Sequence, residues 1–305
     1  MGGAVRLETM NVLWIFAHPE QCSLNRAVLT KGISQLREAG HYVQVSDLYA
    51  MGWNPVVDRG DVGHDVGNRF VIGAEQERGY RGGTLSEDIR AEHTKLARAD
   101  AVIFQFPLWW LGPPAILKGW FDRVLVQGFA FGVTGTDGRT RRYGDGGLAG
   151  KRALLTTSVG ARPSSFGPRG IHGDIDHVLF PLLHGTFFYT GMAALPPMVV
   201  YGADRMDDAG YRAVLPDLRE RLATLFTAEP LPFRHEDSGD YDDTLVLRPE
   251  LAPGQTGLDV HYVRDETSGR DVVAHYGTTA VDTSRAARRS PSPGGGRLPA
   301  RSSGS

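Results

Sequence analysis

The segment His18-Pro-Glu-Gln-Cys-Ser-Leu-Asn25 carries side chains suited to binding an anion. It precedes an expected helix, so the free N–H groups of the helix N-terminus would lie beside the polar side chains of Ser23 and Asn25, with His18 at the rim. Ser23 could equally serve only as the N-cap of that helix. The residues themselves leave open a phosphate site or an ordinary helix cap.

A second segment, Pro107-Leu-Trp-Trp-Leu-Gly-Pro113, places two adjacent tryptophans on an apolar loop. A large apolar patch is costly in water unless something covers it. Trp109 and Trp110 could pack in the core or between subunits, which is the commoner use of paired aromatic residues. Their place directly after an apolar run of strand length favours a shelf for a flat aromatic molecule.

His172, in Gly170-Ile-His-Gly-Asp174, is a candidate for proton transfer. A histidine can donate a proton or stabilise a developing phenolate near neutral pH, although a structural histidine would give the same pattern. No Ser-His-Asp or His-Glu-x-x-His arrangement indicates a hydrolase. Cys22 is the only cysteine, which excludes an internal disulfide and a cysteine-based metal site, and we expect no metal.

The elements that must position these residues are five short apolar runs that alternate with amphipathic stretches. Such runs are typical of strands buried on both faces of a parallel sheet, and they cover residues 11–17, 42–46, 101–106, 151–157 and 197–201. The predicted helices cover residues 24–39, 84–98, 114–124, 174–190 and 207–227. We predict an α/β fold with a flavodoxin-like, doubly wound, five-stranded parallel sheet of order 2-1-3-4-5.

In such a sheet, ligands bind at the carboxyl ends of the strands. The loops that begin at His18, Pro107 and Ser158 follow three of these ends, so we expect them to converge on one site. Residues 53–83 and 132–149 lack a clear period and are predicted as loops.

Domain boundaries are expected near residue 233 and near residue 285. We assign residues 11–233 to the sheet domain, 234–285 to a C-terminal extension with short strands at 245–247 and 259–263, and 286–305 to a disordered tail rich in Arg, Ser, Pro and Gly.

Composition limits the class of partner. The chain of 305 residues has a formal net charge of −2, which does not favour nucleic acid or an anionic membrane as the main partner. The apolar run 101–117 is interrupted by Pro107, Pro113 and Pro114, so we expect no membrane span. A single cysteine and no signal peptide at the N-terminus favour the cytoplasm.

Three segments together resemble the flavodoxin-like NAD(P)H:quinone oxidoreductases, the family of DT-diaphorase and its bacterial relatives. They are residues 17–25, residues 99–110 with 114–123, and residues 170–174; the middle segment is the most specific. The similarity extends from Asn11 to about Phe233. The insertion up to Gly83 and the extension after Phe233 are similar to the longer members of the family, so the resemblance implies FAD rather than FMN.

The resemblance also implies roles for individual residues. The loop around the flavin phosphates is matched by His18, Ser23, Leu24 and Asn25. The loop along the isoalloxazine is matched by Pro107, Leu108, Trp109, Trp110 and Leu111. The loop whose backbone amides meet the polar edge of the flavin is matched by Ser158, Val159, Gly160 and Ala161. Asp122 matches an acidic position near the adenine end.

On the substrate side, the resemblance is less complete. His172 matches the histidine that stabilises charge on the reduced flavin or quinone, but Phe166 stands where the family has a tyrosine that partners this histidine. Phe131 and Val133 likewise replace two tyrosines of the active site. We expect the flavin shelf to be retained and the substrate wall to be changed.

The function implied by the resemblance is FAD-dependent, two-electron reduction of quinones or similar aromatic acceptors. NAD(P)H would be the co-substrate, in a ping-pong hydride transfer through flavin N5, and a homodimer would complete each site at its interface. Two alternatives remain. The first is a flavin-binding regulatory subunit of a membrane transporter, and the second is a flavodoxin-type electron carrier.

Overall fold

The structure is a computed structural model that describes residues 8–63 and 69–263. Its core is a parallel sheet whose five main strands are β1 Asn11–Phe16, β2 Tyr42–Asp47, β3 Ala101–Pro107, β6 Arg152–Val159 and β8 Met198–Tyr201. They lie in the order β2-β1-β3-β6-β8, and a two-residue strand, β7 Ala193–Ala194, also pairs with β6. The predicted fold and strand order are confirmed.

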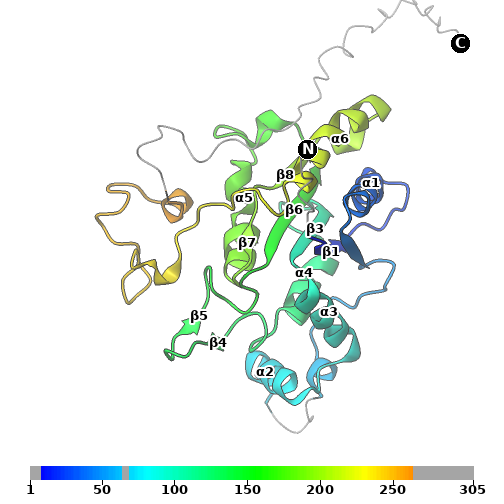
Figure 1. The fold of residues 1–305 in the computed structure, drawn as a ribbon. Helices are drawn as coiled ribbons and strands as arrows, with labels where there is room; N and C mark the ends of the chain where they lie inside the picture. Colours follow the sequence, from blue (N-terminus) through cyan, green and yellow to red (C-terminus); the bar gives the residue numbers. More distant parts are fainter. Residues whose placement is uncertain (1–7, 64–68, 264–305) are drawn as a thin grey trace, which may run out of the picture.

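Helices cover both faces of the sheet (Figure 1). In chain order they are α1 Leu24–Glu38, α2 Ile72–Gly82, α3 Glu87–Arg98, α4 Ala115–Val124, α5 Ile175–Leu182 and α6 Asp208–Ala223. Apolar residues of α1 and α6 form one core cluster, and those of α3, α4 and α5 form the other. This division is the doubly wound arrangement, in which each face of a buried sheet needs its own layer of helices.

Two regions predicted as loops contain regular structure. Residues 53–83 include a 3₁₀ turn, Arg59–Val62, and helix α2. Helix α2 has three glycines and buries only Gln76 and Gly79, so no apolar period in the sequence reveals it. Residues 132–149 include a short hairpin of β4 Val133–Thr134 and β5 Thr140–Arg141.

One other helical region also differs from expectation. The helix expected at 174–190 divides into α5 and a π-helical turn, Leu183–Phe188. Pro216 lies inside α6 without breaking it.

The C-terminal extension contains no regular strand within its described part, so the strands predicted at 245–247 and 259–263 are wrong. Leu245 has a φ of 65°, which turns the backbone, and Leu258–His261 is a 3₁₀ turn. The segment packs instead by its rings, with Phe233 4.9 Å from His184 and 4.6 Å from Tyr262. Residues 264–285 of the extension and the tail at 286–305 lie outside the described residues.

A buried ion pair fixes the insertion before α2 to helix α4. Arg123 donates to Asp61 at 2.6 Å and to Asp88 at 2.7 Å, and its guanidinium lies 4.6 Å from the centre of the Trp53 ring. Arg123 and Asp61 are each 3% exposed. Removing one member of such a pair leaves an uncompensated charge in the interior.

We therefore expect Arg123→Met to lower the free energy of unfolding by about 3–5 kcal/mol. The matched control is Lys118→Met on the same helix, which loses an exposed pair with Asp122 and should cost less than about 1 kcal/mol. Denaturant unfolding of the two variants measures both effects. If both variants lost the same free energy of unfolding, burial of the ion pair would not explain the effect of Arg123→Met.

The imidazole of His184 is packed between aromatic rings, stacked on Phe180 at 4.5 Å. Burial, and secondarily the charge of His261, lowers its pKa from 6.5 to about 4. The unfolded chain therefore binds more protons between these two values. The contribution of His184 to stability is complete above pH 6.5 and is lost as the pH falls toward 4.

The expected slope for this one group is at most about 1.4 kcal/mol per pH unit. The variant His184→Phe keeps an aromatic ring and removes the titrating group. Its midpoint temperature of thermal unfolding should fall less between pH 7 and pH 4 than that of the wild type. An unchanged slope would contradict the assignment.

Candidate functional site

Three of the loops singled out from the sequence leave the sheet at the same edge. The register pairs Phe16 with Gln105 and Pro107 with Ser158, so β1, β3 and β6 end side by side. The N–H of Leu108 also donates to the carbonyl of Ser158 at 2.9 Å. The predicted convergence of these loops at the carboxyl edge is therefore present.

The first loop folds around the start of α1. The Ser23 hydroxyl accepts from the N–H of Arg26 at 3.2 Å and donates to the carbonyl of Glu20 at 2.7 Å, so its capping role is confirmed. His18 accepts from the N–H of Glu20 through Nδ1 at 3.1 Å. Both predicted side chains thus hold the loop closed, while Leu24 packs against the core below it.

A chain of buried hydrogen bonds joins the three loops beneath the edge. The Asn25 amide donates to the Ser158 hydroxyl at 2.8 Å. The Gln105 amide donates to the carbonyl of Asn25 at 2.7 Å and accepts from the indole of Trp14 at 3.0 Å. Gln105 was not among the predicted site residues, although a single amide in an apolar strand is itself a signal because it needs buried partners.

The tryptophan loop contains a two-residue turn in an unfavourable conformation. The N–H groups of Trp109 and Gly112 each donate to the other's carbonyl at 3.0 Å, which closes the turn. Trp110 and Leu111 between them have φ values of 53° and 58°. Two-residue turns with positive φ at both positions are normally built from Asn-Gly, so these two side chains are held at a cost in backbone energy.

This turn also exposes its apolar side chains. The Trp110 side chain is fully exposed, and Trp109 and Leu111 are each close to half exposed. The ring of Trp109 lies 6.4 Å from that of His18, tilted by 54°. Trp109 therefore faces the first loop. The exposed ring of Trp110 can cover another molecule.

The predicted catalytic pair is adjacent in space. The rings of Phe166 and His172 lie 4.8 Å apart at 35°, with Phe166 buried and His172 exposed. The backbone N–H of His172 donates to the carbonyl of Ser165 at 3.0 Å, which fixes the loop. Behind Phe166 lies Tyr201 of β8 at 5.8 Å, a residue that the sequence did not single out.

Burial, and secondarily the carboxylates of Asp176 and Asp174, raises the pKa of Tyr201 to about 12. Its phenol therefore stays protonated throughout the neutral range. It packs against Phe166, which in turn contacts His172.

Of the other residues predicted for the site, Val159 and Ala161 lie in the third loop, whereas Asp122 lies on α4. Val159 is buried, and the carbonyl of Ala161 accepts from the N–H of Gly202 at 3.1 Å. Asp122 stands apart on the exposed side of α4, where its carboxylate pairs with Lys118 at 2.7 Å. The structure thus gathers the three loops, packs Phe166 of the predicted catalytic pair against Tyr201, and gives Asp122 a separate ion pair.

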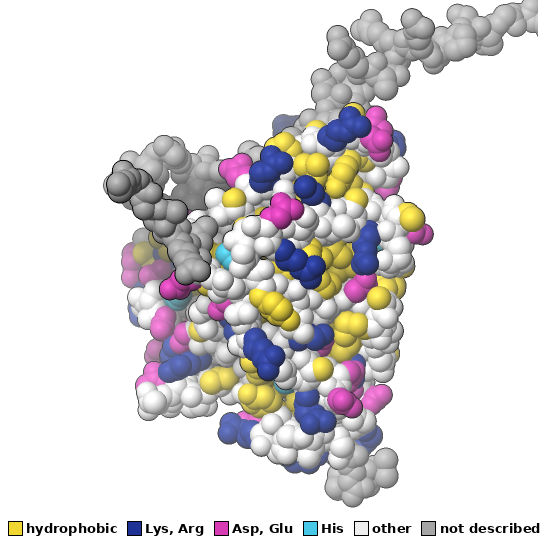
Figure 2. All heavy atoms as spheres, turned by 45° about the vertical axis from the view of Figure 1, so that its right-hand side comes forward, with side chains coloured by type: hydrophobic (Ala, Val, Ile, Leu, Met, Phe, Trp, Pro, Cys, Tyr) yellow, Lys and Arg dark blue, Asp and Glu magenta, His cyan; other side chains and the backbone are white. Residues whose placement is uncertain are grey.

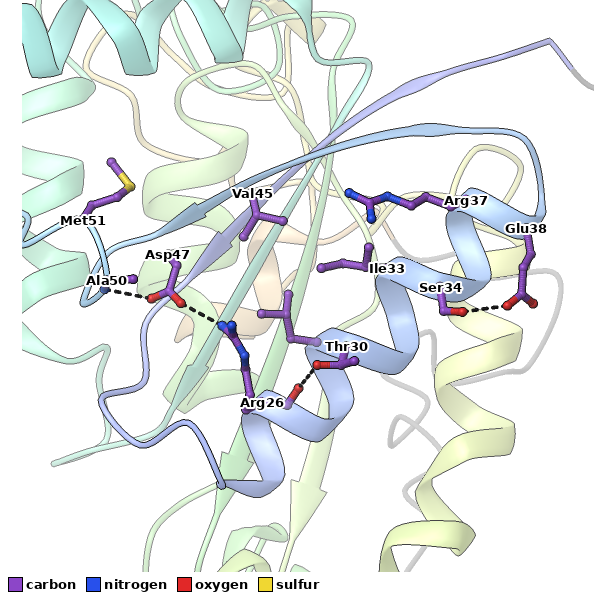
Figure 3. Close-up of a pocket in the computed structure, with 11 residues that line it drawn as sticks. Arg26, Thr30, Ile33, Ser34, Arg37, Glu38, Val45, Asp47, Ala50 and Met51 are labelled. Carbon is purple, nitrogen blue, oxygen red and sulfur yellow. Dashed lines mark hydrogen bonds and ion pairs between the residues drawn. The ribbon is translucent and has the colours of Figure 1, made fainter.

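The hollow between α1 and β2 is distinct from this group. It has a volume of about 720 Å³, and Arg26 reaches across it to Asp47 at 2.7 Å (Figure 3). On the face seen in Figure 2, Lys and Arg side chains are interspersed with Asp and Glu.

The described residues have neither a membrane-spanning helix nor a metal-binding cluster. No helix there is both long and apolar enough to cross a membrane. Residues 8–63 and 69–263 also contain no cluster of three or more metal-binding side chains.

Comparison with curated proteins gives two informative relatives. The chain is similar to a ribosyldihydronicotinamide dehydrogenase-like protein, traD, of Penicillium crustosum, with 40% identity over 86% of this chain and 99% of that protein. It is also similar to NAD(P)H dehydrogenase (quinone) 1 of Rattus norvegicus, with 38% identity over 72% of this chain and 79% of that protein.

Solved structures agree with these relatives. A candidate quinone reductase from Klebsiella pneumoniae is 48% identical, with a TM-score of 0.80 over 84% of this chain and 100% of that one. An NAD(P)H:quinone oxidoreductase from Methanothermobacter marburgensis is 28% identical, with a TM-score of 0.56 over 73% and 100% of the two chains. Residues 10–222 match the family described by its flavodoxin-like fold. The chain is therefore an oxidoreductase that belongs to the flavodoxin-like NAD(P)H:quinone oxidoreductase family.

Proposed function

We propose that this protein binds FAD and catalyses the two-electron reduction of quinones, or of similar aromatic acceptors, by NAD(P)H. The observation that carries the proposal is the exposed turn of Trp110 and Leu111, both of which have positive φ. This turn follows the end of β3, where the N–H of Leu108 donates to the carbonyl of Ser158. Strain of this kind persists where function requires it. The names of the relatives from Rattus norvegicus and Klebsiella pneumoniae support quinone reduction and give no support to a transporter subunit.

The residues at the carboxyl edge fit a flavin in two respects. The N–H groups of Leu24 and Asn25, in the first turn of α1, have no acceptor within the described chain, and such groups favour a phosphate. The exposed ring of Trp110 offers an apolar face to a flat heterocycle. FAD, when bound, would supply hydride acceptance and donation at N5 between the two substrates.

His172 is the residue that we assign to charge stabilisation on the substrate side. Its imidazole is exposed and has no hydrogen-bond partner in the described chain, so it can donate to a substrate oxygen. Phe166 fixes the orientation of the imidazole through ring contact but has no hydroxyl through which to pass a proton. His172 therefore exchanges protons with substrate or solvent directly, while NAD(P)H and the acceptor bind in turn.

We also propose a cytoplasmic homodimer in which the partner completes each site. Trp110 is 102% exposed and Ile171, next to His172, is 92% exposed. Two large apolar side chains this accessible, one on the tryptophan turn and one next to His172, favour coverage by a second copy. A dimer interface there would also exclude water from the substrate.

The purified protein should be yellow, or should become so with FAD, and mass analysis should identify FAD in the released cofactor. His172→Ala should retain the flavin and reduce quinone turnover by about 10²-fold, since it removes one proton donor. The control is His177→Ala, an exposed histidine of α5 that pairs with Asp259 at 2.8 Å, and its turnover should not change. A colourless protein that cannot be reconstituted would contradict the proposal, and loss of flavin in His172→Ala would make that residue structural.

The strained turn gives a separate prediction. Trp110→Gly should be more stable than Trp110→Ala by about 1 kcal/mol, because glycine accepts a φ of 53° and alanine does not. Both variants should bind FAD more weakly than the wild type, since both lose the ring. Thermal unfolding of the apoproteins and a flavin titration separate the two effects, and unchanged flavin affinity would remove Trp110 from the shelf.

A further inference from the structure

The carboxylate of Asp204 lies directly against the backbone of Gly160. A Cβ added to Gly160 would be 2.0 Å from Asp204 Oδ2 and 2.7 Å from its Cγ, so no larger residue fits at position 160 while Asp204 keeps this position. Gly160 belongs to the 158–161 loop at the end of β6, and Asp204 belongs to the 3₁₀ turn Ala203–Arg205 that follows β8. Two neighbouring strand ends therefore place a carboxylate on this loop.

The placement of Asp204 is fixed by the backbone. The register pairs Val159 with Tyr201, and the N–H of Gly202 donates to the carbonyl of Ala161 at 3.1 Å. Gly202 itself has a φ of 70°, which turns the chain back over the loop. The approach of Asp204 to Gly160 thus follows from β-sheet pairing and one glycine turn.

The charge of Asp204 is not neutralised by a salt bridge within residues 8–63 and 69–263. The basic residues closest to it in sequence and in the loop, Arg205 and Arg162, are both exposed. An exposed but unpaired carboxylate keeps a negative potential over the groups that it touches, weakened by solvent.

From this contact we infer that the negative charge of Asp204 lowers the reduction potential of the bound flavin. The inference rests on the proposed function and on the role that the family resemblance implies for the 158–161 loop, contact with the polar edge of the flavin. Two-electron reduction adds negative charge to that edge, and a nearby carboxylate disfavours it. The reduced protein would then be a stronger reductant toward its acceptor.

The test is the midpoint potential of the flavin in the holoprotein, measured by equilibration with a reference dye. We expect Asp204→Asn to shift it to a more positive value than in the wild type, and the difference to shrink at high salt. Asp204→Ser, which removes the charge with a smaller side chain, should shift it in the same direction. The matched control is Asp208→Asn, an exposed carboxylate in the first turn of α6, which should leave the potential unchanged.

The outcomes distinguish the role of Asp204 from the proposed function. If the wild type binds flavin and both Asp204 variants have its potential, the tuning role is wrong and the proposed function stands. If Asp208→Asn shifts the potential as much as Asp204→Asn, the effect is one of net charge and the specific contact with Gly160 is not responsible. A wild-type protein that takes up no flavin overturns both proposals.

Discussion

The structure depends on the buried hydrogen-bond chain that runs from Trp14 through Gln105 and Asn25 to Ser158. Each of these polar groups lies where water does not reach, so each bond that fails would leave an unsatisfied donor or acceptor at a cost of about 1–3 kcal/mol. The chain crosses β1, β3, α1 and β6. It therefore sets the spacing of the three loops at the carboxyl edge.

On this rigid base the molecule places its two unusual features, the turn with Trp110 and Leu111 and the carboxylate of Asp204 on Gly160. Neither is favourable by itself, because one costs backbone energy and the other crowds a charge against a loop. Each follows the end of a paired strand, β3 for the turn and β8 for Asp204. The site is thus specified by the sheet and not by the loops alone.

The sheet could be predicted from the sequence because a strand buried on both faces is almost wholly apolar, as Ala101–Pro107 is apart from Gln105. Helix α2 could not, since it packs through Gln76 and Gly79 and not through an apolar stripe. The extension misled for the opposite reason. Leu245 and Val246 are exposed, and of the residues at 259–263 only Tyr262 is buried, against the ring of Phe233.

For the site, motif residues such as Ser23 and His172 could be named in advance, whereas Gln105 and Asp204 depend on contacts between distant strand ends.

The turn at Trp110 and Leu111 has a consequence for protein engineering. A procedure that selects residues for backbone compatibility would choose Asn-Gly at these two positions. It would report a gain in stability and would erase the proposed shelf without disturbing any core residue. Redesign of this fold therefore has to hold both positions constant, because the feature of greatest use to a ligand is the one that folding energy alone would remove.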